Sequence, residues 1–270
     1  MTLLTEPTRI VLAKGYSLPD DADAVAYIAA VEAADGQALE TATRMAINSF
    51  VKGCKADGIW PAIKASCILA GARTLAGALV PLVGTAPTNF NFVSGDYNRE
   101  TGLVGNGSTK YLNTNRNNNA DPQDNHSQGV FVHTAQPSDS AAYIGVATGA
   151  ITGATHLGVD YVSSFAFFRS RAITAFTSIG LQGATGLLGT TRSSGSSFTF
   201  RVASSSTTSN TASETSASGN VYVFARNVSD AINVPTSGRL QFYWIGESLD
   251  LALLDARVTS LINAFAAAIP

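Results

Sequence analysis

The 270-residue chain has a formal net charge of −2, with 13% charged and 45% hydrophobic residues. Lysine and arginine do not cluster anywhere in the sequence, which excludes the basic surface that nucleic-acid binding or an anionic membrane would require. Serine, threonine, asparagine, alanine and glycine replace charged residues, so we expect a surface that is polar through hydroxyl and amide groups. Apolar residues recur along the whole chain, which argues against extended disorder.

The N-terminal part of the chain predicts an extended arm followed by helices. Residues 1–19 show no clear period and no signal-peptide pattern. Asp20 is a suitable N-cap for a first helix, which Gly36 ends. We expect a second helix at 37–52 and a third at 59–72, where a proline near the start is tolerated because the first turn needs no amide donor.

Two features of this helical region bear on where the protein works. Cys54 and Cys67 are too few for a disulfide scaffold, and we expect two buried thiols rather than a bridge. The apolar stretch 59–83 is interrupted by proline, glycine and basic residues, so it predicts buried helices and no membrane span.

Beyond residue 86 the pattern changes to short β-strands. Residues 89–92, Asn-Phe-Asn-Phe, alternate with period two, and clusters of turn-forming residues separate the later candidates. The Ser/Thr-rich segment 193–218 predicts a loop or a long exposed hairpin. Many short strands at this spacing favour an antiparallel sandwich or a barrel. Further strands are expected at 110–112, 129–133, 142–146, 165–169, 198–202, 220–226 and 239–245.

The chain ends in an amphipathic helix. Asp250 can cap this helix, and Leu249 and Leu254 are spaced as a hydrophobic staple. Apolar residues form a stripe along one face of this helix, and the stripe must pack against either the sandwich or a partner subunit. Its residues are Leu251, Leu254, Val258, Leu261 and Phe265.

Three segments resemble a known family. Residues 56–65 (ADGIWPAIKA) and 102–112 (GLVGNGSTKYL), in this order, resemble phage and prophage virion proteins that carry a LamG-type jelly roll after a helical segment. The ending YWIGESL at 243–249, followed by a helix, is similar to the last strand and helix of such jelly rolls. The resemblance covers residues 45–265 and reports fold more than function.

The resemblance implies a mainly β fold: an antiparallel jelly-roll β-sandwich of the concanavalin/LamG-like type, preceded by a small helical region and closed by a C-terminal helix. We expect residues 1–85 to form an arm and helical region for anchoring or oligomerisation, and residues 86–270 to form the jelly roll. The implied function is a non-enzymatic bacteriophage virion structural protein, such as a capsid decoration, spike or tail-fibre module. The expected partners are other virion proteins and copies of the chain in a homotrimer. The expected location is the virion, assembled in the host cytoplasm.

A second hypothesis is a carbohydrate- or receptor-binding adhesin module on the same particle, which binds a host surface glycan through the loops at 113–125 and 193–218. Amide and carboxylate oxygens crowd the first loop, and these are the ligands that calcium prefers. No EF-hand spacing occurs, and asparagine-rich turns held by their own hydrogen bonds explain the same composition. No cofactor is expected, and calcium stays an open alternative. The candidate ligand residues are Asn113, Asn115, Asn117, Asn118, Asp121 and Asp124.

Catalysis is not expected from this sequence, and glycan hydrolysis is only a third hypothesis. A glycosidase needs two facing carboxylates, but acids are sparse in the β region and no Gly-x-Ser-x-Gly elbow is present. His126, His133 and His156 do not share metal-ligand spacing, which favours structural roles. Aromatic residues at period-two spacing predict core positions, although Phe167 and Phe168 must point to opposite faces, so that one of them can reach the surface.

Overall fold

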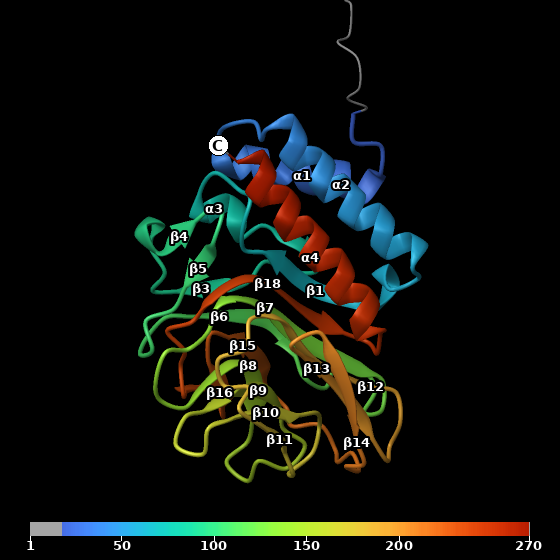
Figure 1. Ribbon diagram of the computed structural model, residues 1–270, viewed down its shortest axis with the longest axis vertical. Helices are drawn as coiled ribbons and strands as arrows, with labels where there is room; N and C mark the ends of the chain where they lie inside the picture. Colours follow the sequence, from blue (N-terminus) through green and yellow to red (C-terminus); the bar gives the residue numbers. More distant parts are fainter. Residues whose placement is uncertain (1–17, 270) are drawn as a thin grey trace, which may run out of the picture.

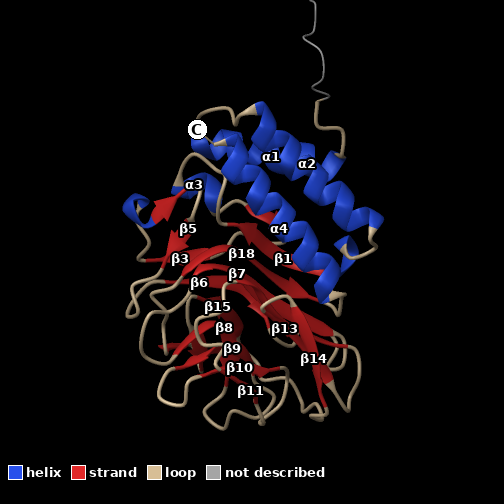
Figure 2. Ribbon diagram, viewed as in Figure 1, coloured by secondary structure: helices blue, strands red, loops and turns tan. Residues whose placement is uncertain are grey.

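A computed structural model describes residues 18–269, so the arm expected at 1–19 lies almost wholly outside the described residues. The helices are α1 (Ala22–Asp35), α2 (Thr41–Ala56), α3 (Leu75–Ala78) and α4 (Leu251–Ala268), with 3-10 turns at Trp60–Ala62 and Ser94–Asp96. All other regular elements are strands (Figure 2).

The strands form two sheets. Sheet A has the order β14-β13-β12-β7-β18-β1-β2, with β5 also paired to β18 and β4 paired to β5. Its strands are β1 (Ile63–Ile68), β2 (Pro81–Val83), β4 (Tyr97–Asn98), β5 (Gly102–Val104), β7 (His126–Thr134), β12 (Gly186–Arg192), β13 (Phe198–Val202), β14 (Ser205–Ser209) and β18 (Arg239–Gly246). Sheet B has the order β11-β10-β9-β8-β15-β6-β3, with β16 also paired to β8 and β17 paired to β16. Its strands are β3 (Thr88–Phe90), β6 (Tyr111–Asn117), β8 (Ala141–Ala147), β9 (Thr155–Asp160), β10 (Phe165–Arg169), β11 (Phe176–Ile179), β15 (Asn220–Val223), β16 (Arg226–Val228) and β17 (Ala231–Asn233).

The molecule has three layers: helices, sheet A and sheet B (Figure 1). Strand pairing in both sheets is antiparallel, except that β16 runs parallel to the end of β8. One apolar core lies between the sheets, and a second lies between sheet A and the helices. The mainly β, antiparallel sandwich with a helical N-terminal region and a C-terminal helix is thereby confirmed.

The first two helices follow the sequence pattern with shifted boundaries. Gly36 ends α1 in the left-handed conformation, at φ 64°, as expected. The N-cap of α1 is Asp21 and not Asp20, because the Asp21 carboxylate accepts the amides of Asp23 and Ala24. Asp20 instead accepts hydrogen bonds from Asn48 and Lys52, which join the start of α1 to α2.

The third expected helix, at 59–72, is wrong. Pro61 belongs to the short 3-10 turn, and the chain then continues as β1, which lies between β18 and the edge strand β2 in sheet A. Ala65 and Cys67 face the core between the sheets, whereas Ile63 and Ile68 face the helices. A strand that is buried on both faces shows no polar alternation, so its apolar run resembles a helix.

The surface that α4 covers is the sandwich of its own chain. The predicted apolar stripe is buried, and it belongs to the same core cluster as Phe242 and Trp244 of β18. Asp250 caps the helix as expected, accepting the amides of Ala252 and Leu253. Among the described residues, α4 is also the one helix that is long and apolar enough to cross a bilayer by composition, a test that a core-covering helix also passes.

The Trp244 side chain fits a slot in the helix-facing side of sheet A. Gly189, Gly129 and Trp244 lie side by side across β12, β7 and β18. A Cβ atom on either glycine would overlap the indole ring. The indole is fully buried, and its Nε1 donates to Ser127 Oγ at 3.1 Å. Glycine at both positions is therefore what admits the large ring.

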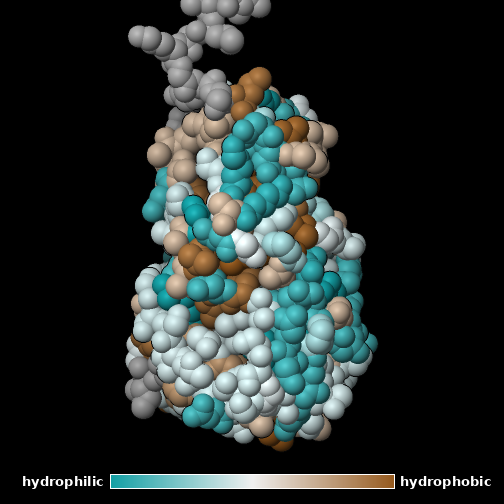
Figure 3. Space-filling view, turned by 90° about the vertical axis from the view of Figure 1, so that its right-hand side faces the viewer, coloured by the Kyte–Doolittle hydropathy of each residue, from teal (hydrophilic) through white to brown (hydrophobic). Residues whose placement is uncertain are grey.

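Most of the expected strands are present. The Ser/Thr-rich segment, for which a loop or a hairpin was expected, contains the β13–β14 hairpin. Much of the sandwich half of the surface in Figure 3 is of intermediate hydropathy, as expected for hydroxyl-rich and small residues, and a strip along one side is hydrophilic. Phe168 is fully buried while Phe167 is half-buried on the opposite face, which confirms the expected split.

Cys54 and Cys67 are buried, unbridged thiols, as expected, although Cys67 lies on β1 and not on a helix. Burial raises the pKa of both thiols to about 12, so they are unreactive at neutral pH. The division of the chain at residue 85 stays a prediction. Strands β1 and β2 precede this boundary and are nevertheless hydrogen-bonded into sheet A.

Candidate functional site

The two sheets differ in what covers their outer faces. The helices cover sheet A, whereas sheet B forms the opposite side of the molecule (Figure 1). Along β15 and β6, Val221, Val223 and Leu112 point into the core. Because side chains alternate along a strand, Tyr222 and Tyr111 point to the outer face. Sheet B is therefore the sheet whose outer face can meet a ligand.

An aromatic pair occupies the β3–β6 end of this face. Phe90 and Tyr111 are cross-strand partners, and their rings stack with centroids 4.4 Å apart and an interplanar angle of 5°. The Phe90 side chain is 36% exposed. Tyr222 extends the row, 4.6 Å from Tyr111, but it is buried and its hydroxyl lies 3.4 Å from the carbonyl oxygen of Asp230. Phe90 and Tyr111 thus form the accessible part of the row.

Two of the predicted ligand residues lie beside this pair. Asn113 is the cross-strand partner of Thr88, next to Phe90 and Tyr111 in the ladder. Asn115 is exposed, and its Nδ2 donates to Thr88 Oγ1 at 3.0 Å and to the carbonyl of Ala86 at 2.9 Å. The Asn113 Oδ1 accepts the amide of Asn115 at 2.9 Å. Aromatic rings, amides and a hydroxyl are therefore gathered on one small area, the aromatic–amide platform (Phe90, Tyr111, Thr88, Asn113 and Asn115).

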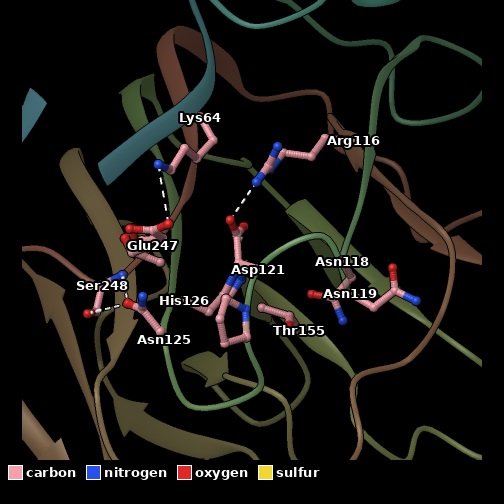
Figure 4. A network of polar contacts seen from close by, with 12 residues as sticks. Lys64, Arg116, Asn118, Asn119, Asp121, Asn125, His126, Thr155, Glu247 and Ser248 are labelled. Carbon is pink, nitrogen blue, oxygen red and sulfur yellow. Dashed lines mark hydrogen bonds and ion pairs between the residues drawn. The ribbon is translucent and has the colours of Figure 1, made fainter. Parts of the chain in front are cut away.

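The other predicted ligand residues point elsewhere. Asn117 Oδ1 accepts the amides of Asn119 and Gly219. Asn118 is fully buried, and its Nδ2 donates to the carbonyl of Ala217 at 3.0 Å. Asp121 is 5% exposed and forms an ion pair with Arg116, with His126 Nδ1 3.9 Å away (Figure 4).

The structure brings the two predicted binding loops together. Ser213 in the Ser/Thr-rich segment accepts a hydrogen bond from Gln123 Nε2 at 2.8 Å, and it donates to the Asp124 carboxylate. The fully buried Arg171 donates to the carbonyls of Asn118 and Pro122. These hydrogen bonds are consistent with the interpretation that the loop at 113–125 is held by hydrogen bonds within the protein. Within residues 18–269 no group of three or more His, Cys, Asp and Glu side chains gathers as a metal site, and calcium binding by the loop stays a prediction.

Asn118→Ala should lower the free energy of unfolding by about 1–3 kcal/mol, because the carbonyls of Ala217 and Gly153 lose their donor in a buried place. Urea denaturation measures this effect. Asn119→Ala is the control, since Asn119 is exposed in the same loop and should change stability little. Equal losses for both variants, or a loss that appears only after calcium is removed with EDTA, would contradict this account.

An arginine–histidine cluster, consisting of Arg169, Arg226 and His156, lies elsewhere on the outer face of sheet B. Arg169 on β10 is the cross-strand partner of His156 on β9, and Arg226 begins β16. Both Nη1 atoms lie 3.4 Å from His156 Nε2. The imidazole is 2% exposed, and it contacts the Phe167 ring edge-to-face at 4.9 Å. Burial, together with the two guanidinium charges, keeps the pKa of His156 well below its ordinary value.

Sequence reasoning missed this cluster, because its members are separated by 13 and 70 residues and form no motif. Only the pairing of β10 with β9, and the approach of β16 to β8, bring them together. Hydropathy alternation would have placed Arg169 on the same face as Phe167, but nothing in the sequence relates either residue to Arg226.

No protein-family model matches this sequence, and no curated protein matches it. Among solved structures, the NanB sialidase from Streptococcus pneumoniae is similar with a TM-score of 0.41 and 10% identity, over 56% of this chain and 27% of that chain. The CBM40 of the Ruminococcus gnavus IT-sialidase has a TM-score of 0.39 and 10% identity, over 50% of this chain and 82% of that chain. Mouse laminin alpha1 LG4-5 has a TM-score of 0.34 and 13% identity, over 47% of this chain and 37% of that chain.

This chain therefore spans about a quarter of the length of the sialidase that it resembles. Similarities this weak carry no argument about function, which has to rest on the residues of the outer face. None of these structures points to a phage origin.

Proposed function

We propose that this protein is a non-enzymatic glycan-binding module and that the outer face of sheet B carries its ligand. The observation that carries the proposal is the stacked pair of Phe90, which is exposed, and Tyr111, which is half-buried, on the sheet face that the helices leave open. Monomeric proteins seldom expose large apolar side chains in groups without a function.

The chemistry of the platform fits a sugar. A sugar ring has an apolar face that packs on an aromatic ring, and hydroxyl groups around its edge that need hydrogen-bonding partners. Phe90 and Tyr111 supply the ring surface, and Asn113 and Thr88 supply amide and hydroxyl groups on the same side of the strands. The area carries no ion pair among residues 18–269, so it suits a ligand recognised through hydroxyl groups.

The virion structural role that the resemblance implies stays a prediction, as do a homotrimer and a particle location. The outer face of sheet B is compatible with such a location, because an adhesin on a particle must present its binding face outward. Glycan hydrolysis would require two carboxylates facing each other, and the platform contains none.

Phe90→Ala and Tyr111→Ala should each weaken glycan binding about tenfold, which corresponds to about 1.4 kcal/mol. Ligands found on a glycan array would be titrated by calorimetry against each variant. Val25→Ala is the control, because Val25 is a comparably exposed apolar residue, at 45%, on α1 of the helical layer. An array without any binding, or ligands whose affinity does not depend on Phe90 and Tyr111, would refute the proposal.

A further inference from the structure

The arginines of the described chain nearly all have partners that neutralise or fully engage them. Six form ion pairs, and three donate to backbone carbonyls. The ion pairs are Arg44–Glu32, Arg73–Glu40, Arg99–Glu40, Arg116–Asp121, Arg201–Asp255 and Arg257–Asp57. The carbonyl donors are Arg171, Arg192 and Arg239. Arg169 and Arg226 are the exceptions.

These two guanidinium groups converge on one neutral acceptor. Among the described side chains, which exclude those of residues 178 and 179, His156 Nε2 is the one acceptor within hydrogen-bonding distance of Arg169. Arg226 adds a hydrogen bond to Asn233 Oδ1 at 2.6 Å, which brings no negative charge. The Nε atoms of both arginines are buried without a hydrogen-bond partner, and so is His156 Nδ1.

The arrangement is electrostatically costly. Burial and the neighbouring charge of Arg226 both lower the pKa of Arg169, and burial lowers the pKa of Arg226. The charge of Glu214 raises the pKa of Arg169, but this is the smallest of the three effects, and the Glu214 carboxylate already accepts the amide of Gly153 at 2.8 Å. Like charges in a partly desolvated place destabilise a protein unless something neutralises them. Within the described part of the chain, Arg169 and Arg226 therefore lack a negatively charged partner that would neutralise them.

We propose that Arg169 and Arg226 form an anion-binding centre and that the ligand of this face is an acidic glycan, bearing a carboxylate or a sulfate ester. The inference rests on the proposed glycan-binding function. Planar guanidinium groups bind such oxyanions through paired, charge-assisted hydrogen bonds.

The position of the cluster supports a ligand that also reaches the aromatic–amide platform. Arg169 on β10 and Tyr111 on β6 are four strands apart in sheet B, which corresponds to roughly 19 Å. An oligosaccharide of several rings spans this distance. Between the two areas, Gly145 of β8 is the cross-strand partner of both His156 and Tyr222 and carries no side chain.

The test is a glycan array that contains neutral oligosaccharides together with their sialylated, uronate-bearing and sulfated counterparts. We expect the acidic members to bind and their neutral counterparts to bind at least about tenfold more weakly. Affinity for the acidic members should fall further as salt is raised. The sialylated and uronate arms distinguish recognition of a carboxylate from recognition of a sulfate ester.

The double variant Arg169→Gln/Arg226→Gln should abolish the preference for acidic glycans. Its control is Lys52→Gln/Lys55→Gln, which removes the same formal charge from the helical layer and should keep the preference. Arg169→Lys/Arg226→Lys keeps the charge without the planar fork, and it should restore only part of the affinity. Thermal melting of each variant, measured alone, verifies that it is folded.

The possible outcomes separate this inference from the proposed function. Binding of neutral glycans that depends on Phe90 and Tyr111, without any preference for acidic ones, would overturn the inference and keep the function. Binding of acidic glycans that the Arg169→Gln/Arg226→Gln variant leaves unchanged would also overturn it. An array without binding would refute both.

Discussion

Acidification from neutral pH to about pH 4 should cost the protein about 3 kcal/mol of stability through His126 alone. His126 lies on β7 with none of its surface exposed, and both ring nitrogens are buried without a hydrogen-bond partner. Burial lowers its pKa from 6.5 to about 4. The charges of Arg171 and Arg116 act in the same direction, and Asp121 opposes them.

The sign follows from proton binding in the two states. Between about pH 6.5 and pH 4, the unfolded chain binds a proton at this residue and the folded chain does not. The free energy of unfolding is therefore unaffected by His126 above about pH 6.5, and it falls as the pH drops towards 4. His156 adds to the loss, because burial and two nearby arginines keep its pKa well below the ordinary value.

Urea denaturation at a series of pH values measures the effect. His126→Asn removes the titrating group and should flatten the acid limb of the stability curve, even if the variant is less stable at neutral pH. His133→Gln is the matched control for the loss of an imidazole, since His133 is exposed near the other end of the same strand. The interpretation fails if His126→Asn retains the full acid dependence.

Trp244→Ala should lower the free energy of unfolding by about 3–5 kcal/mol, the range for removing a large buried side chain. The ring fills the slot above Gly129 and Gly189, between sheet A and the helices, and these two glycines carry no side chain that could fill the space it leaves. Ser127 also loses its indole donor. Chemical denaturation followed by far-ultraviolet circular dichroism reports the change. Leu253→Ala, at a partly exposed position of α4, should cost far less.

The converse substitution, at a glycine that the Trp244 ring covers, tests the same slot. Gly189→Ala places a methyl group against the Trp244 ring and should be destabilising by about 1–3 kcal/mol, the usual cost of overpacking. In the Trp244→Ala background the methyl group has room, so the second loss should shrink. Additive losses in the double variant would show that the ring and the glycine do not compete for one space.

Much of the fold could be predicted from the sequence, because local patterns specify it. Asp250 and the apolar stripe identify α4, and period-two alternation identifies strands such as β10 and β13. Prediction failed at β1, where burial on both faces removes the alternation that separates a strand from a helix.

The candidate site was harder to predict than the fold. Asparagine clustering pointed to the region of Asn113 and Asn115, but it could not show that Asn118 turns inward or that Phe90 stacks on Tyr111. Pairing between distant strands decides these contacts. The approach of Arg226 to Arg169 depends wholly on such pairing, so the spacing of the two residues in the sequence could not predict it.

Both ends of the described chain, near residues 18 and 269, emerge among the helices, at the pole farthest from sheet B (Figure 1). Anything tethered to either end would therefore be held behind the sandwich, and the open sheet would point away from the attachment. Immobilising the protein through a C-terminal tag should consequently leave that sheet free for a soluble partner. Coupling chemistry directed at sheet B would obstruct it.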